Sequence, residues 1–287
     1  MANFTAKDVN ELRKNTGVGM MDCKKALTEA DGDVEKAMLI LREKGLATQA
    51  KKAGRVAAEG MVIAKVNADH TVGCVVEVNS ETDFVANTDE FKAFVNTVAD
   101  TIIEKNPADV EALKSTVIAG GTATVDEALQ ELFLKIRENL QIRRFTRLEG
   151  ILVPYIHGGG KIGVLVTFNV EGIDPASGAF QKCGRDIAMQ VAALNPVSAT
   201  REDVPADVAA HEMEIYKAQA AESGKPEAIQ EKIALGRMDK FYKENCLAEQ
   251  DFVKNPDLTV AQYADECAKE MGGKIAITGF VRFALGE

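Results

Sequence analysis

The sequence predicts an α+β fold, and three observations support this class. Helix-type apolar spacing fills the start of the chain, a β-rich segment occurs twice, and a highly charged segment after residue 204 carries only a thin apolar stripe. We therefore expect an N-terminal module of three helices, two duplicated α+β subdomains and an inserted antiparallel helical hairpin. The predicted boundaries are 1–45 for the module, 46–58 for a linker, 59–140 for the first subdomain, 141–204 and 246–287 for the two parts of the second, and 205–245 for the hairpin.

The first 45 residues contain the signals of three short helices. Thr5 and Asp8 form a capping-box pattern at the start of the first helix. The Gly-Val-Gly sequence at 17–19 is expected to end this helix. Asp33 can cap the third helix, and Gly45 is expected to end it. The apolar stripe of this helix consists of Val34, Ala37, Met38 and Leu41. Three short helices bury little area, so the module is expected to be only marginally stable alone.

An internal repeat predicts the two subdomains. Residues 59–79 and 149–169 align without gaps and share a Glu-Gly start and a central glycine, Gly73 or Gly163. Each copy has two β-rich runs around a polar turn, followed by a helical pattern, which indicates a hairpin packed on a helix. Asp126 can cap a further helix between the copies. The β-rich run 275–285 is expected to complete the second sheet.

Residues 205–245 predict two helices joined by a turn. Pro205 can open the first helix, and the sequence Ser-Gly-Lys-Pro at 223–226 is a turn signal. Both helices are charged outside a narrow stripe, so we expect an antiparallel pair that projects from the body. The stripe consists of Ala209, Met213, Tyr216, Ala220, Ile229, Ile233, Met238 and Phe241.

Charge and composition narrow the classes of function. The formal net charge of −10 argues against nucleic acid as the main ligand. The cluster of Arg143, Arg144 and Arg147 is interpreted as a solvated face. No apolar run approaches the roughly 18 residues of a membrane helix, and the charged start lacks a signal core. The five cysteines are scattered, as in a reduced cytosol. We expect a cytoplasmic protein that binds neither nucleic acid nor membrane.

No motif for covalent chemistry is present. The three histidines have no cysteine or carboxylate neighbours at metal-ligand spacing. The sequence Gly-Gly-Gly-Lys at 158–161 superficially resembles a phosphate loop, but Tyr155 and Ile162 stand where that loop needs glycine and Ser or Thr. A hairpin turn is the better interpretation. We therefore expect no catalytic residue, no cofactor and no metal.

A polar segment, residues 80–87, follows the first copy of the repeat, and the second copy has no counterpart. A loop between a strand and a helix that carries Asp83 and Phe84 can present an aromatic ring to a partner. The alternative, which the local pattern favours, is that Phe84 packs into the core of its own subdomain.

Two long segments carry a resemblance to a known family. Residues 77–87, EVNSETDFVAN, and residues 12–27, LRKNTGVGMMDCKKAL, resemble the two signatures of the elongation factor Ts family. Shorter similarities at 155–157, 223–226, 236–238 and 278–283 extend the resemblance over nearly the whole chain. It implies a ubiquitin-associated-like N-terminal module, a core of two subdomains, and a coiled-coil hairpin that can support a homodimer.

The resemblance also implies a function. Members of the family are guanine-nucleotide exchange factors rather than enzymes; they bind elongation factor Tu and promote GDP release by disturbing its Mg²⁺ and phosphate site. The residues implied to enter that site are Thr82, Asp83, Phe84 and Val85. The residues implied to support the contact are His157 and Ile136, and those implied in N-terminal docking are Gly17, Val18, Gly19, Met20 and Met21.

Two departures from the family pattern affect these expectations. Arg137 stands where we expect a small residue, which weakens the expected contact at Ile136. The chain stops at Glu287, so we expect no contribution from the further helix found in some relatives. Two alternatives stay open. One is a protein-binding adaptor with a ubiquitin-associated-like module and no exchange activity. The other is an enzyme, which would need a pocket with perturbed titratable groups.

Overall fold

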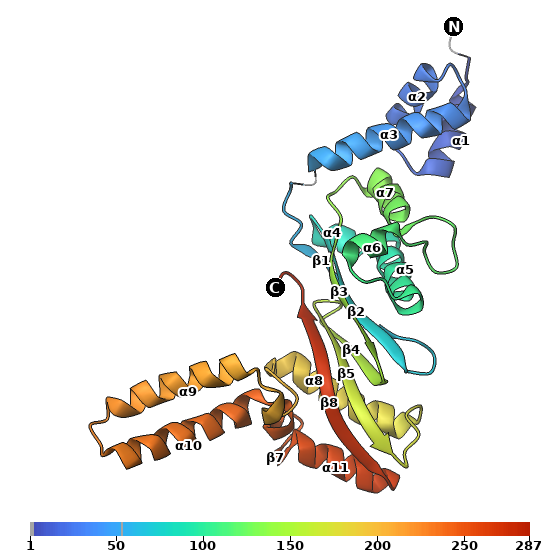
Figure 1. The fold of residues 1–287 in the computed structure, drawn as a ribbon. Coiled ribbons are helices and arrows are strands. Elements are labelled where there is room, and N and C mark those ends of the chain that lie inside the picture. The colour runs from blue at the N-terminus through green and yellow to red at the C-terminus, as the bar shows by residue number, and fades with distance from the viewer. Residues whose placement is uncertain (1–2, 53) are drawn as a thin grey trace.

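A computed structural model describes residues 3–52 and 54–287; residues 1–2, at the charged start, and Ala53, in the expected linker, lie outside the described residues. The predicted α+β class is confirmed, because helices pack against small antiparallel sheets. A helical module lies at one end, two sheets form the body, and a long helical hairpin projects from the other end (Figure 1). In the described part of the chain, no helix combines the length and apolar character needed to cross a membrane.

Three helices form the N-terminal module: α1 (Ala6–Thr16), α2 (Met20–Glu29) and α3 (Val34–Lys52). The predicted capping box of Thr5 and Asp8 opens α1, and Gly17 closes it in the left-handed conformation, with φ 68°. Leu12 and Leu27 are fully buried in the core that the three helices share. The local signals therefore identify the helices of this module correctly.

The length of α3 corrects one prediction. Gly45 does not end the helix, which continues to Lys52, so much of the expected linker is helical. Gly45 lies where α3 packs against α7 (Val125–Ile136), and a Cβ atom at this position would clash with Leu134. The glycine therefore serves the close approach of two helices rather than a helix end.

The first sheet has the order β1-β2-β3 and is antiparallel. Its strands are β1 (Glu59–Val66), β2 (Val72–Ser80) and β3 (Gln141–Glu149), and its helices are α4 (Asp83–Ala86), α5 (Asp89–Lys105), α6 (Val110–Ser115) and α7. The apolar stripe of α5, including Phe91 and Ile102, is buried in the first core. Two expectations are corrected. β3 pairs with β2 although the boundary at 141 assigned it to the second subdomain, and Thr124 rather than Asp126 caps α7.

The second sheet has the order β4-β5-β8 and is also antiparallel. Its strands are β4 (Ile151–His157), β5 (Ile162–Glu171) and β8 (Lys274–Ala284), and its helices are α8 (Gly178–Leu194) and α11 (Val260–Met271). A small ribbon of β6 (Asp251–Phe252) and β7 (Asn255–Thr259) precedes α11. The pairing of β8 with β5 confirms that the last β-rich run completes this sheet.

The two sheets pack against each other through a shared apolar layer. Val62, Val75, Leu152 and Leu165 are buried in this layer. A Cβ atom at Gly163 would lie 2.7 Å from Val62 Cγ1, and one at Gly73 would lie 3.1 Å from Leu152 Cδ1. The glycine shared by both copies of the repeat therefore lets each sheet approach the other closely.

The inserted hairpin consists of α9 (Ala206–Ala221) and α10 (Glu227–Asn245), which pack side by side and project from the body (Figure 1). Met213, Tyr216, Met238 and Phe241 of the predicted stripe form its seam. The sequence predicts that Ile229, near the start of α10, belongs to this seam. Its side chain is 44% exposed, so the seam does not extend that far.

Candidate partner-binding site

The segment 82–85 forms a single turn of helix at the end of β2. Thr82 caps α4, and its Oγ1 accepts a hydrogen bond from the backbone N–H of Val85 at 3.4 Å. Val85 packs against the first core and Ala86 is buried, whereas Asp83 and Phe84 face solvent. Phe84 is 83% exposed, so the expectation that its ring packs into its own core is wrong. The turn presents an aromatic ring beside a carboxylate.

Two carboxylates hold this turn in place. Glu138 accepts hydrogen bonds from the backbone N–H and the Oγ1 of Thr82, at 3.0 and 2.8 Å. Glu81 accepts from the backbone N–H of Asn139 at 2.6 Å and from Arg55 at 3.4 Å. The hydrogen bond from Asn139 lowers the pKa of Glu81 below its ordinary value, because it stabilises the charged form. The turn is thus bonded to the segment that follows α7.

The tip of the β4–β5 hairpin lies at the same end of the first sheet. The backbone N–H of Val62 donates to the carbonyl of Gly160 at 2.7 Å, and the first residues of β1 pair with the last residues of β2. Gly158, Gly159 and Gly160 all have positive φ, which confirms the predicted hairpin turn. His157 is exposed at this tip, with its Nδ1 3.0 Å from Tyr155 Oη.

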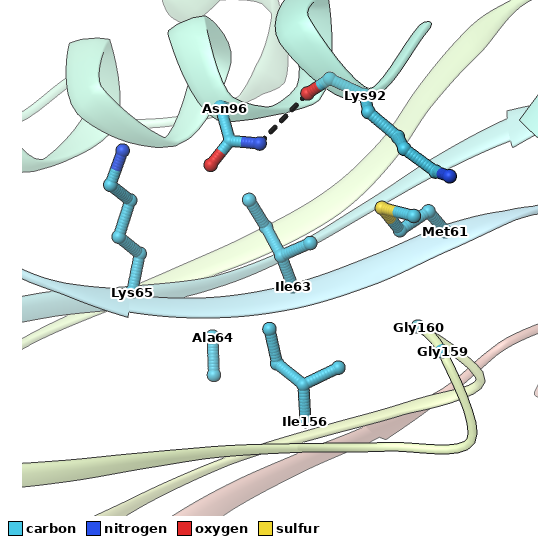
Figure 2. Close-up of a pocket in the computed structure, with 9 residues that line it drawn as sticks. All are labelled: Met61, Ile63, Ala64, Lys65, Lys92, Asn96, Ile156, Gly159 and Gly160. Carbon is cyan, nitrogen blue, oxygen red and sulfur yellow. Dashed lines mark hydrogen bonds between the residues drawn. The ribbon is translucent and has the colours of Figure 1, made fainter. Parts of the chain in front are cut away.

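A shallow cavity of about 290 Å³ separates this tip from α5. Figure 2 shows Met61, Ile63 and Ile156 forming its apolar centre, with Lys65 and Lys92 at its edges. Ile156 is 43% exposed here. Backbone glycines of the tip complete the lining, so the cavity suits apolar contact with a partner rather than acid–base chemistry.

The expected N-terminal docking residues differ in exposure. Met20 and Met21 are 44% and 64% exposed at the start of α2, and Gly19 caps that helix. Val18 is 1% exposed and belongs to the core of the module. The side chain of Val18 is therefore not available for surface contact, whereas the side chains of Met20 and Met21 are.

Ile136 is the last residue of α7, and its half-buried side chain packs against the first core. Arg137 follows in the left-handed conformation, with φ 62°, and its Nη2 donates to Asp22 Oδ2 at 2.8 Å. The end of α7 therefore lies between the start of α2 and the Thr82 turn. The connection after α7 thus contacts both the start of α2 and the Thr82 turn.

Arg144 and Arg147 do not form the solvated face that the sequence predicts, although Arg143 remains exposed. Glu77 is fully buried, and it pairs with Arg143 at 3.3 Å and with Arg144 at 2.7 Å. Arg147 donates to the carbonyl of Ile103 at 3.3 Å. Internal contacts therefore occupy all three guanidinium groups.

Sequence reasoning missed Glu138 and Glu77. Each forms a hydrogen bond with a residue distant in the chain. Glu138 and Thr82 are 56 residues apart, and Glu77 and Gly286 are 209 residues apart. The charge of Glu77 within the apolar run 72–78 was an available signal, because a charge is rarely buried without a partner. No local pattern marks Glu138.

Comparison with known proteins shows the family of the chain. A family profile described as Elongation factor TS matches residues 81–287. The chain belongs to the elongation factor Ts family. Elongation factor Ts of Trichlorobacter lovleyi is 51% identical over 289 residues, which cover 99% of this chain and 93% of that protein. Elongation factor Ts of Clostridioides difficile is 50% identical over 289 residues, with 100% and 94% covered. Membership in the elongation factor Ts family makes the chain a factor of protein biosynthesis.

Proposed function

We propose that this chain is the guanine-nucleotide exchange factor for elongation factor Tu. In this proposal the Thr82–Val85 turn enters the partner near its Mg²⁺ and phosphates, while the β4–β5 tip and the start of α2 make supporting contacts. The observation that carries the proposal is Phe84: its ring is 83% exposed on a turn that the side chains of Thr82 and Val85 anchor. An anchored turn with an exposed aromatic suits insertion into a partner pocket.

The proposed mechanism needs no covalent step. A GTPase holds GDP through backbone donors, a lysine and Mg²⁺. A factor that binds the nucleotide-free form more tightly than the GDP form lowers GDP affinity by the same coupling free energy. Phe84 supplies apolar binding energy on insertion, and Asp83 brings a negative charge near the groups that hold the phosphates. The chain then acts by binding alone, and it is not an enzyme in the usual sense.

The substitution Phe84→Ala tests the proposal. Burying one phenylalanine contributes about 1.5–3 kcal/mol, so we expect GDP release from elongation factor Tu to slow roughly 10- to 100-fold. The measurement is stopped-flow release of labelled GDP. The fold is expected to survive, because the ring makes little contact with its own subdomain.

Val253→Ala is the matched control. Val253 is an exposed apolar residue near the β6–β7 ribbon, at the opposite end of the body from α4 (Figure 1). Its loss is expected to leave the release rate unchanged. If Phe84→Ala accelerates GDP release as much as the wild-type chain does, Phe84 has no part in the mechanism. If the wild-type chain itself fails to accelerate GDP release, the adaptor alternative is favoured.

We also predict a ubiquitin-associated-like docking role for the N-terminal module, a homodimer through the coiled-coil pairing of α9 and α10, and a cytoplasmic location. Analytical ultracentrifugation with and without elongation factor Tu tests the second. A sedimentation coefficient of a single chain at all concentrations would contradict the homodimer.

A further inference from the structure

The connection between α7 and β3, residues 137–140, is bonded to elements on both sides. Arg137 closes α7, and its guanidinium donates to Asp22 of α2 at 2.8 Å. The carbonyl of Arg137 accepts a hydrogen bond from Lys52, the last residue of α3. The first residue of this connection is thus tied to two helices of the N-terminal module.

Asn139 ties the connection two residues after Arg137. Its backbone N–H donates to Glu81 at 2.6 Å, and its Nδ2 donates to the carbonyl of Arg55 at 2.8 Å. Asn139 is 6% exposed, so these bonds form out of water and restrain the backbone effectively. Glu138 therefore stands between two residues whose positions are fixed by long-range contacts.

The carboxylate of Glu138 is bonded to Thr82 through both of its oxygens, at 3.0 and 2.8 Å. Since the hydroxyl of Thr82 donates its proton to Glu138, its lone pairs are directed elsewhere and accept from Val85 N–H. A helix of four residues is unstable by itself, because nucleation costs more than one turn of hydrogen bonds returns. The contact from Glu138 thus stabilises the geometry of α4.

We propose that Glu138 is a positioning residue: by holding Thr82, it fixes the direction in which Phe84 leaves the surface. The inference rests on the proposed exchange function and adds to it a residue that sits outside the Thr82–Val85 segment. A turn fixed before contact loses less conformational freedom on binding than a mobile one. Glu138 thereby makes insertion of the exposed ring more favourable without forming part of the inserted segment.

A double-mutant cycle between Glu138 and Phe84 tests the inference, with labelled GDP on elongation factor Tu as the probe. Loss of a helix cap contact predicts that Glu138→Ala slows GDP release roughly tenfold. If Glu138 acts through Phe84, GDP release from elongation factor Tu is no slower with the double variant than with Phe84→Ala alone. A general loss of structure would instead add to the effect of Phe84→Ala.

Thr82→Val provides a second variant with a smaller change. It removes the hydroxyl that links Glu138 to Val85 and keeps the shape of the side chain, so it is expected to slow release and to be non-additive with Phe84→Ala as well. Glu131→Ala removes an exposed carboxylate from the same helix, α7, and is expected to leave the rate unchanged.

The outcomes separate the inference from the proposed function. If Phe84→Ala slows release but Glu138→Ala and Thr82→Val do not, or if their effects add to that of Phe84→Ala, the positioning role is wrong and the exchange function stands. If elongation factor Tu releases GDP with Phe84→Ala at the same rate as with the wild-type chain, the proposed mechanism and the positioning role fail together.

Discussion

Arg137 adopts a backbone conformation that favours glycine. Its φ and ψ are 62° and 26°, and a side chain in this region costs about 1–2 kcal/mol. This conformation allows Arg137 to form an ion pair with Asp22, but the two side chains are 43% and 42% exposed. A surface pair of this kind contributes about 0–1 kcal/mol, so it does not offset the strain fully.

Arg137→Gly is therefore expected to unfold less readily than Arg137→Ala. Both variants lose the ion pair, but only alanine keeps a Cβ atom in the left-handed conformation. After the greater freedom of glycine in the unfolded chain is subtracted, the difference is about 0.5–1 kcal/mol. Urea unfolding measures it. The same two substitutions at Glu131, which is exposed on α7, are expected to rank in the opposite order, because alanine is favoured within a helix. Equal stability at position 137 would contradict the left-handed backbone.

At the scale of elements, the module and the first subdomain meet where α3 crosses α7. Leu134 of α7 packs against the core of the N-terminal module rather than the core of its own subdomain. Gly45 allows this contact, since any side chain there would clash with Leu134. The two helices thereby share one apolar contact, and the module is joined to the body by packing as well as by the chain.

Two helical glycines make a matched comparison of this contact. Gly236 lies in α10, and a Cβ atom added to it would meet no neighbouring atom within 4 Å, so Gly236→Ala is expected to stabilise the protein by about 0.5–1 kcal/mol. Gly45→Ala has the same gain in helix propensity, but it overpacks the contact with Leu134. We expect it to be less stable than Gly236→Ala by about 1 kcal/mol or more. Thermal unfolding of both variants tests this, and equal stabilisation would show that α3 and α7 are not in close contact.

At the scale of the whole molecule, Glu77 joins the two sheets. This buried residue of β2 accepts hydrogen bonds from Arg144 of β3 at 2.7 Å and from the backbone N–H of Gly286 at 3.0 Å. Arg144 also donates to the carbonyl of Ala284 at 3.0 Å and lies over the ring of Phe283, 4.3 Å from its centroid. One carboxylate thus holds the first sheet and the end of β8 together.

Glu77→Gln is expected to lower the free energy of unfolding by about 2 kcal/mol, because two guanidinium groups lose their charged partner. Glu149→Gln is the matched control in the same sheet: it removes a carboxylate that is 67% exposed and pairs with Arg147. A change below about 0.5 kcal/mol is expected there. Denaturant unfolding measures both, and hydrogen exchange along β8 should quicken only in Glu77→Gln. Equal effects would show that Glu77 does not join the sheets.

Local sequence signals determined much of this protein. The helical pattern of α5, the capping box at Thr5 and the hairpin pattern of each repeat copy depend on residues close together in the chain, so their structural consequences were predictable. The segment 77–87 likewise indicated the elongation factor Ts family without any knowledge of the fold.

Tertiary structure alone decided the rest. Local pattern favoured a buried Phe84, a helix end at Gly45 and solvated arginines at 144 and 147, and each expectation was wrong. The roles of these residues depend on contacts with distant segments, which local spacing does not encode. Glu138 belongs to the same class, because its place beside Thr82 follows from the packing of α7 in the first core. The sequence by itself determined most elements and the family, whereas long-range packing decided which side chains are exposed.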